Sequence, residues 1–140
     1  MSNQHWTKTL WMRIQEPRIV SMVQALIYAL CFIGGLVTIT DPPRSIAGTL
    51  GYGATLAWGG FAVLGGAMGM YAAPTGKWLV EKPAIIACIT AIAMYAGILI
   101  TLQVAEAGNR IPQLTFVLIG LLHFVNRYAR IKPYSYEPGK

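Results

Sequence analysis

Few residues of this chain have the types and spacing that chemistry requires. The carboxylates Glu16, Glu81 and Glu106 all lie at or outside the edges of the long hydrophobic segments. No Asp, Glu, Lys or Arg lies in the central part of any of these segments. Proton-coupled transporters and ion pumps usually carry such groups within the membrane. We therefore do not expect proton-coupled export.

The histidines and cysteines do not form a recognisable site in the sequence. His123 is the one titratable group inside a hydrophobic run, one helical turn from Arg127, and His5 is the only other histidine. We expect an interfacial His123 with a backbone or water partner. Cys31 and Cys88 lie in separate apolar segments without metal-ligand spacing, so no metal site is predicted and we expect buried, inert thiols.

Catalytic motifs are not found either. Ser21 and Ser45 have no His or carboxylate placed to activate them. The chain lacks a phosphate-binding glycine loop, a Gly-x-Ser-x-Gly elbow and a Cys-x-x-Cys pair. We predict a protein that is not an enzyme and that uses no cofactor.

Long hydrophobic spans must position the residues named above. The chain has 140 residues, of which 55% are hydrophobic and 11% charged, against about 25% charged in an average soluble domain. Uninterrupted apolar blocks near the ~20 residues needed to cross a bilayer predict an all-α polytopic membrane protein, with four transmembrane helices in a small bundle. The transmembrane domain covers 19–128, with spans at about 19–40, 49–72, 83–104 and 111–128.

Segments rich in basic and aromatic residues flank this domain. Residues 1–18 place Trp6 and Trp11 on one face of a short amphipathic helix, which we expect to lie on the membrane surface. Residues 129–140 form a basic tail. We expect the two tryptophans to anchor the chain at the membrane interface, together with Trp78, Arg127 and Arg130.

The basic residues predict an orientation. Nine of the eleven Lys and Arg residues lie in the N-terminal segment, in the loop between spans two and three, and at the C-terminal end, while Arg44 and Arg110 lie on the other side. Cytoplasmic loops carry such an excess. Both termini are therefore expected in the cytoplasm, as an even number of spans requires. We interpret the excess of basic residues as a signal of membrane orientation, and we expect no nucleic-acid partner.

The second span is rich in glycine. Small residues at a spacing of four let another helix approach closely. We expect this face to pack against a helix of the same chain or of another copy, and both options stay open. The packing and oligomerisation residues that we predict are Gly59, Ala62, Gly65, Gly66 and Gly69. In the first span, Gln24 and Tyr28 are one turn apart and are candidates for hydrogen bonds to a neighbouring helix.

Four short motifs carry a resemblance. They are Pro17–Ser21 before the first span, Asp41–Pro43 after it, Gly108–Arg110 before the fourth span, and Tyr134–Pro138 in the tail. With them the chain resembles small four-span membrane proteins of actinobacteriophages, which are often regarded as holins. The resemblance implies a small protein with a basic cytoplasmic tail that assembles into membrane lesions and releases or activates a wall-degrading enzyme.

These observations lead to a main hypothesis and its alternatives. The main one is a phage holin-like protein that oligomerises in the inner membrane of the host and permeabilises it during lysis, with the lipid bilayer, further copies and a phage lysis protein as partners. Its alternative is a non-lytic interaction protein, such as an anchor, a lysis regulator or a superinfection-exclusion factor. A passive channel would need a continuous polar stripe along one span, and none of the four spans has one.

Overall fold

The structure is a computed structural model that describes residues 18–42, 48, 51–105 and 108–132. Four helices occupy most of this part of the chain: α2 (Arg18–Thr40), α4 (Tyr52–Thr75), α5 (Trp78–Ala105) and α6 (Ile111–Ile131). All four are long and apolar enough to cross a membrane. The predicted all-α bundle of four membrane-spanning helices is confirmed. The amphipathic helix predicted within 1–18 and the tail from 133 onward lie outside the described residues.

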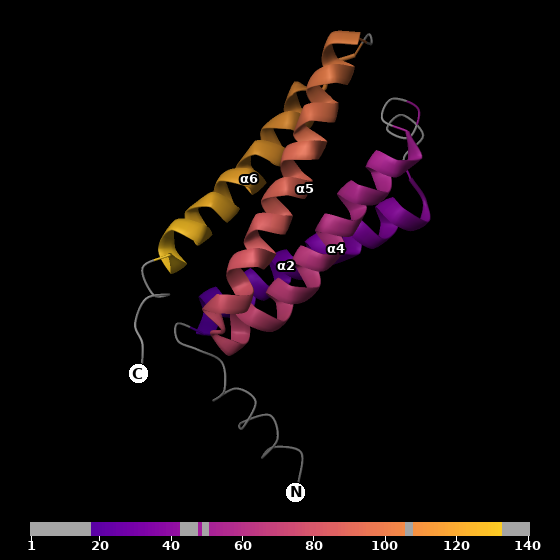
Figure 1. The fold of residues 1–140 in the computed structure, drawn as a ribbon. Helices are drawn as coiled ribbons and strands as arrows, with labels where there is room; N and C mark the ends of the chain where they lie inside the picture. Colours follow the sequence, from indigo (N-terminus) through magenta and orange to yellow (C-terminus); the bar gives the residue numbers. More distant parts are fainter. Residues whose placement is uncertain (1–17, 43–47, 49–50, 106–107, 133–140) are drawn as a thin grey trace, which may run out of the picture.

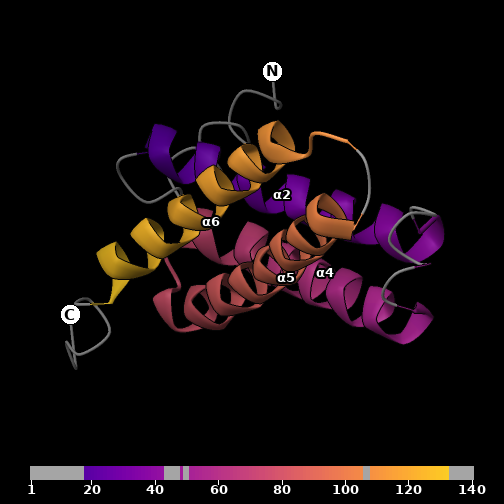
Figure 2. The ribbon, with the colours of Figure 1, turned by 90° about the horizontal axis from the view of Figure 1, so that it is seen from above.

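The helices form two antiparallel hairpins, α2 with α4 and α5 with α6 (Figure 1). The first residues of α2, the turn between α4 and α5, and the last residues of α6 meet at one end of the bundle, which we call the terminal end. We call the opposite end the loop end. Figure 1 shows that the hairpins separate toward the loop end, and Figure 2, which views the bundle from above, shows α6 crossing α2 at an angle. The bundle is therefore closed at the terminal end and opens toward the loop end.

The turn between α4 and α5 is shorter than the sequence suggests. Helix α4 ends at Gly76, whose left-handed φ of 67° closes the helix while its N–H donates to the carbonyl of Ala72. Helix α5 starts at Trp78, before the expected start at Pro83. The backbone carbonyl of Lys77 accepts hydrogen bonds from two residues of the next turn, so the helix is established before Pro83 removes one donor.

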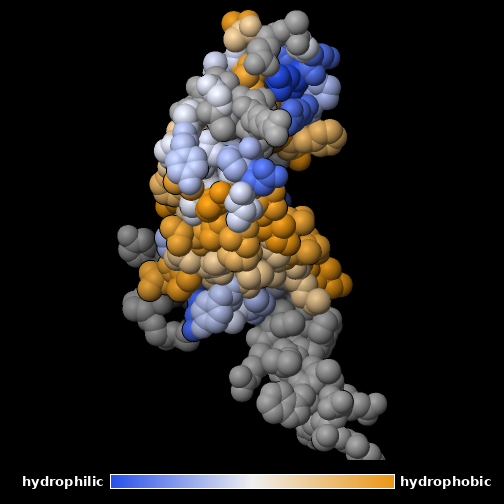
Figure 3. All heavy atoms as spheres, turned by 90° about the vertical axis from the view of Figure 1, so that its right-hand side faces the viewer, coloured by the Kyte–Doolittle hydropathy of each residue, from blue (hydrophilic) through white to orange (hydrophobic). Residues whose placement is uncertain are grey.

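An apolar band surrounds the middle of the molecule. Figure 3 shows it on one face, with hydrophilic residues at both borders. Exposed Ile, Leu, Val and Phe side chains cover the outer faces of α2 and α6 in particular. Within the most apolar stretch of α6, only 11% of the residues are buried inside the bundle, against 39% for α4 and for α5. Helix α6 is thus the least enclosed of the four.

The glycines of α4 pack inside the chain. A Cβ atom on Gly66 would lie 2.7 Å from the backbone carbonyl oxygen of Tyr28 on α2, and one on Gly65 would lie 2.8 Å from that of Ala84 on α5. Gly59 and Ala62 face α2 in the same way, against Ile39 and Gly35, and Gly69 faces the ring of Tyr28. Helix α4 is therefore wedged between α2 and α5. Of the two options that the sequence left open, the structure has the first: this face packs against α2 and α5 of the same chain.

Candidate functional site

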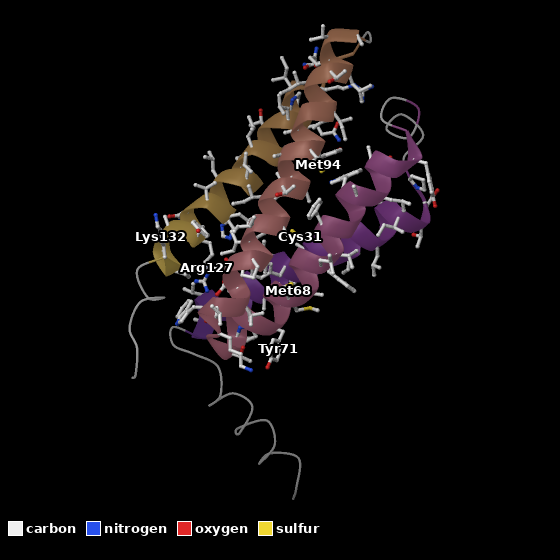
Figure 4. The ribbon with its side chains drawn as sticks, viewed as in Figure 1. Cys31, Met68, Tyr71, Met94, Arg127 and Lys132 are labelled. Atoms are coloured by element: carbon white, nitrogen blue, oxygen red, sulfur yellow. The ribbon has the colours of Figure 1, made fainter. Side chains whose placement is uncertain are left out.

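A buried ion pair lies at the terminal end. Glu81, in the first turn of α5, is completely buried. Its Oε1 accepts a hydrogen bond of 2.7 Å from Nε of Arg127 on α6, and its Oε2 accepts one of 3.0 Å from Nη2. Figure 4 shows Arg127 between α6 and the start of α5. Such a bidentate ion pair fixes both the distance and the relative orientation of the two side chains. It therefore joins α5 to α6.

Helix α2 reaches the same carboxylate through Tyr28. The Tyr28 hydroxyl donates to Oε1 of Glu81 at 3.3 Å, and its ring lies 5.5 Å from that of Phe124 on α6. The ring lies where a side chain on Gly69 of α4 would stand. All four helices therefore meet around Tyr28, and the Gly residue at position 69 has a specific role, which is to leave room for this ring.

The residues predicted as membrane-interface anchors do not share one environment in the structure. The guanidinium of Arg127 turns inward to Glu81, and its side chain is only 13% exposed, whereas we expected it to extend into the interface. A buried carboxylate attracts it more strongly than the headgroup layer, because the carboxylate would otherwise be an unpaired charge. The ring of Trp78 lies 5.6 Å from Cζ of Arg127 and is half-buried. Arg130 is exposed, and Trp6 and Trp11 lie outside the described residues.

A second polar contact lies one helical turn further into the bundle. Nε2 of His123 on α6 donates to Oε1 of Gln24 on α2 at 2.9 Å. The interhelical hydrogen bonds that we expected of Gln24 and Tyr28 are thus confirmed. His123 has a side-chain partner where we expected backbone or water. The other amide atom of Gln24, Nε2, is buried without a hydrogen-bond partner, which makes this the least satisfied point of the cluster.

We call these five residues the polar clasp: Gln24, Tyr28, Glu81, His123 and Arg127. Its opposite charges compensate each other, and it connects α2, α5 and α6. Among the described residues, no group of three or more His, Cys, Asp or Glu side chains could hold a metal ion. The arrangement suits a structural clasp that holds the helices together. The sequence did not reveal it, although Glu81 and Arg127 both belong to the side of the membrane that carries the excess of basic residues.

A cavity of about 340 Å³ lies between the hairpins, in the half of the bundle toward the loop end. Cys31 on α2 and Cys88 on α5 both line it, and both belong to one hydrophobic cluster. Both cysteines are free, and Cys31 lies in the interior of the bundle (Figure 4). Two thiols that are far apart in the sequence are thus neighbours.

An aromatic pair lines the same cavity. The rings of Trp58 on α4 and Tyr95 on α5 stack with centroids 5.0 Å apart and planes at 3°. The Tyr95 hydroxyl also accepts a hydrogen bond from the side-chain amide of Gln113 on α6. This pair connects α4 of one hairpin to α5 of the other, nearer the loop end than the polar clasp.

Comparison with models of protein families, with curated proteins and with solved structures finds no match for this chain. Its class therefore follows from the fold. Four helices of membrane-spanning length and composition, with an apolar outer surface and polar contacts turned inward, define a multi-pass helical membrane protein.

Proposed function

We propose that this chain is a holin-like bacteriophage protein, which accumulates in the cytoplasmic membrane of the host, oligomerises and permeabilises the membrane during lysis. The observation that carries the proposal is the concealment of the polar clasp beneath α6, the least enclosed helix. A protein that must remain harmless before it forms a lesion needs polar groups that it can hide and later expose.

The clasp suggests a mechanism for this change. When α6 leaves α2 and α5, Glu81, Arg127, Gln24 and His123 lose their partners. Unpaired polar and charged groups are costly in hydrocarbon, so opened chains gain by associating with one another and by lining a water-filled lesion together. The excess of basic residues at the terminal end supports a cytoplasmic position of both termini, and in this proposal the bilayer and further copies are the immediate partners.

The test is induced expression in a bacterium, alone and together with a peptidoglycan hydrolase that lacks its own export signal. We expect loss of membrane potential after a lag, and lysis only when the hydrolase is present. A Glu81→Gln variant should shorten the lag, because it weakens the clasp, whereas Arg130→Gln at an exposed position should not. Normal growth and membrane potential after prolonged accumulation would refute the proposal.

One observation favours a second candidate, a non-lytic interaction protein such as an anchor, a lysis regulator or a superinfection-exclusion factor. The glycine face of α4 is filled within the chain, so the fold has no need of another copy to cover it. Crosslinking in membranes separates the two candidates. A holin-like protein should give a ladder of self-oligomers, and a regulator should give one band with a different protein, such as a phage lysis protein.

A further inference from the structure

The glycines of this bundle fall into two groups. Those on α4 that were described above touch neighbouring helices. Gly34 on α2 and Gly120 on α6 do not, because a Cβ atom on either would have nothing within 4 Å. Both nevertheless line the cavity between the hairpins. Their missing side chains therefore widen this cavity, and they do not serve helix packing.

The cavity is open toward the bilayer between α2 and α6. The helix pairs that pack extensively are α2 with α4, α4 with α5, and α5 with α6. Helices α2 and α6 meet toward the terminal end, where Gln24 contacts His123 and Tyr28 contacts Phe124. Further toward the loop end the hairpins separate (Figure 1), and Gly34 and Gly120 lie on the two sides of this opening.

Two polar side chains of the lining have hydrogen-bond partners. The Thr38 hydroxyl donates to the carbonyl of Gly34 at 2.8 Å, and the Tyr95 hydroxyl accepts from Gln113. The remaining lining consists of aliphatic, aromatic, glycine and thiol groups. An apolar cavity of this kind does not hold water well and takes up apolar ligands, and its volume is at the lower end of the range for small-molecule sites.

The depth of the cavity matches one leaflet. At ~1.5 Å per helical residue, Cys31 lies ~14 Å below Thr40 at the loop end of α2. Gly120 lies at the same depth below Ile111 on α6. The hydrocarbon core of a bilayer is ~30 Å thick, so the cavity reaches from the loop-end surface to about the middle of the membrane.

We infer that this cavity binds one acyl chain of a phospholipid from the leaflet at the loop end, which enters between α2 and α6 and rests against the Trp58–Tyr95 pair. The site requires only that the chain spans a membrane, and it stands independently of a lytic function. The bound acyl chain fills the space that the two open glycines leave and holds the hairpins apart.

Fluorescence quenching by brominated lipids tests this inference. The probe is the chain with Trp58 as its only tryptophan (W6F, W11F and W78F), reconstituted in phosphatidylcholine–phosphatidylglycerol vesicles whose acyl chains carry bromine. Gly34→Leu with Gly120→Leu should fill the site and lower the quenching of Trp58 at least twofold. The control is Gly97→Leu, at an exposed position of α5 with equally open space, which should leave the quenching unchanged.

Native mass spectrometry of the full chain with its own tryptophans gives a second measurement. We expect one phospholipid retained per chain, and loss of that lipid in the variant with both glycines replaced but not in Gly97→Leu. Equal quenching in the filled and control variants would overturn the inference, as would a wild-type chain that retains no lipid or that retains a second copy in its place. If the filled variant loses its helical circular dichroism, the wild-type lipid count alone decides.

Discussion

Glu81 and Arg127 form a two-pronged ion pair inside the bundle, with N–O distances of 2.7 and 3.0 Å, although 46 residues separate them in the sequence. The pair joins the start of α5 to the last turns of α6, and Tyr28 links it to α2. Because α6 is otherwise weakly enclosed, this contact has a large share in holding it against the bundle.

Removal of one partner of this pair should destabilise the fold. Arg127→Leu leaves the Glu81 carboxylate buried and unpaired, which costs about 3–5 kcal/mol. Replacement of both residues by apolar ones should cost much less, because neither charge is then unpaired. The measurement is reversible unfolding in bicelles. Arg130→Leu, at an exposed position, is the control, and an equal loss in the single and double variants would contradict a direct pairing.

The two groups of glycines should respond to alanine in opposite ways. Gly66→Ala places a methyl group 2.7 Å from the carbonyl oxygen of Tyr28, and such overpacking costs about 1–3 kcal/mol. Gly60 lies on the same helix with open space at its Cβ, so Gly60→Ala should be neutral or stabilise by up to about 1 kcal/mol through helix propensity. The same bicelle unfolding assay measures both. A destabilised Gly60→Ala beside an unaffected Gly66→Ala would contradict the described packing of α4.

The fold class could be predicted from the sequence because each membrane span is recognisable from its own consecutive residues. The length of a span, its lack of charged residues and the Pro and Gly residues at its ends can all be read from consecutive positions. In hydrocarbon a helix is the simplest structure that pairs every backbone N–H and C=O group of such a segment. The glycine pattern of α4 likewise predicted close packing. It did not reveal which helix packs there, because a helix of the same chain and a helix of another copy both need the same small residues for close approach.

The polar clasp could not be predicted in the same way. Glu81 falls at the edge of a span when Pro83 is taken as the start of the helix, whereas α4 extends to Thr75 and α5 begins at Trp78. The sequence predicts Arg127 at the membrane interface because it lies near the end of the fourth span. Which residue it pairs with depends on how α5 and α6 lie against each other, and no local pattern encodes that relationship. The same holds for Cys31 and Cys88.

The orientation of the bundle should follow its basic residues. Lys77, Lys82, Arg130 and Lys132 all belong to the terminal end, and Arg110 to the loop end. Cytoplasmic loops carry the excess of Lys and Arg, so a green fluorescent protein fused after Lys140 should fluoresce in a bacterial host. Alkaline phosphatase inserted after Pro42 should be active, as it is only outside the cytoplasm. An active phosphatase at Lys140 would contradict this orientation.

Cys31 and Cys88 should form a disulfide within one chain when a membrane-permeant oxidant is added. Both are free, both line the cavity, and both belong to the same hydrophobic cluster. After oxidation and denaturation, a maleimide of high mass should fail to label either cysteine, whereas the untreated chain should take up two labels. The controls are Cys31→Ser and Cys88→Ser, each of which should keep one reactive thiol under the same treatment. A disulfide-linked dimer in place of the internal bond would place the two thiols on an outer surface and would contradict their shared position in the cavity.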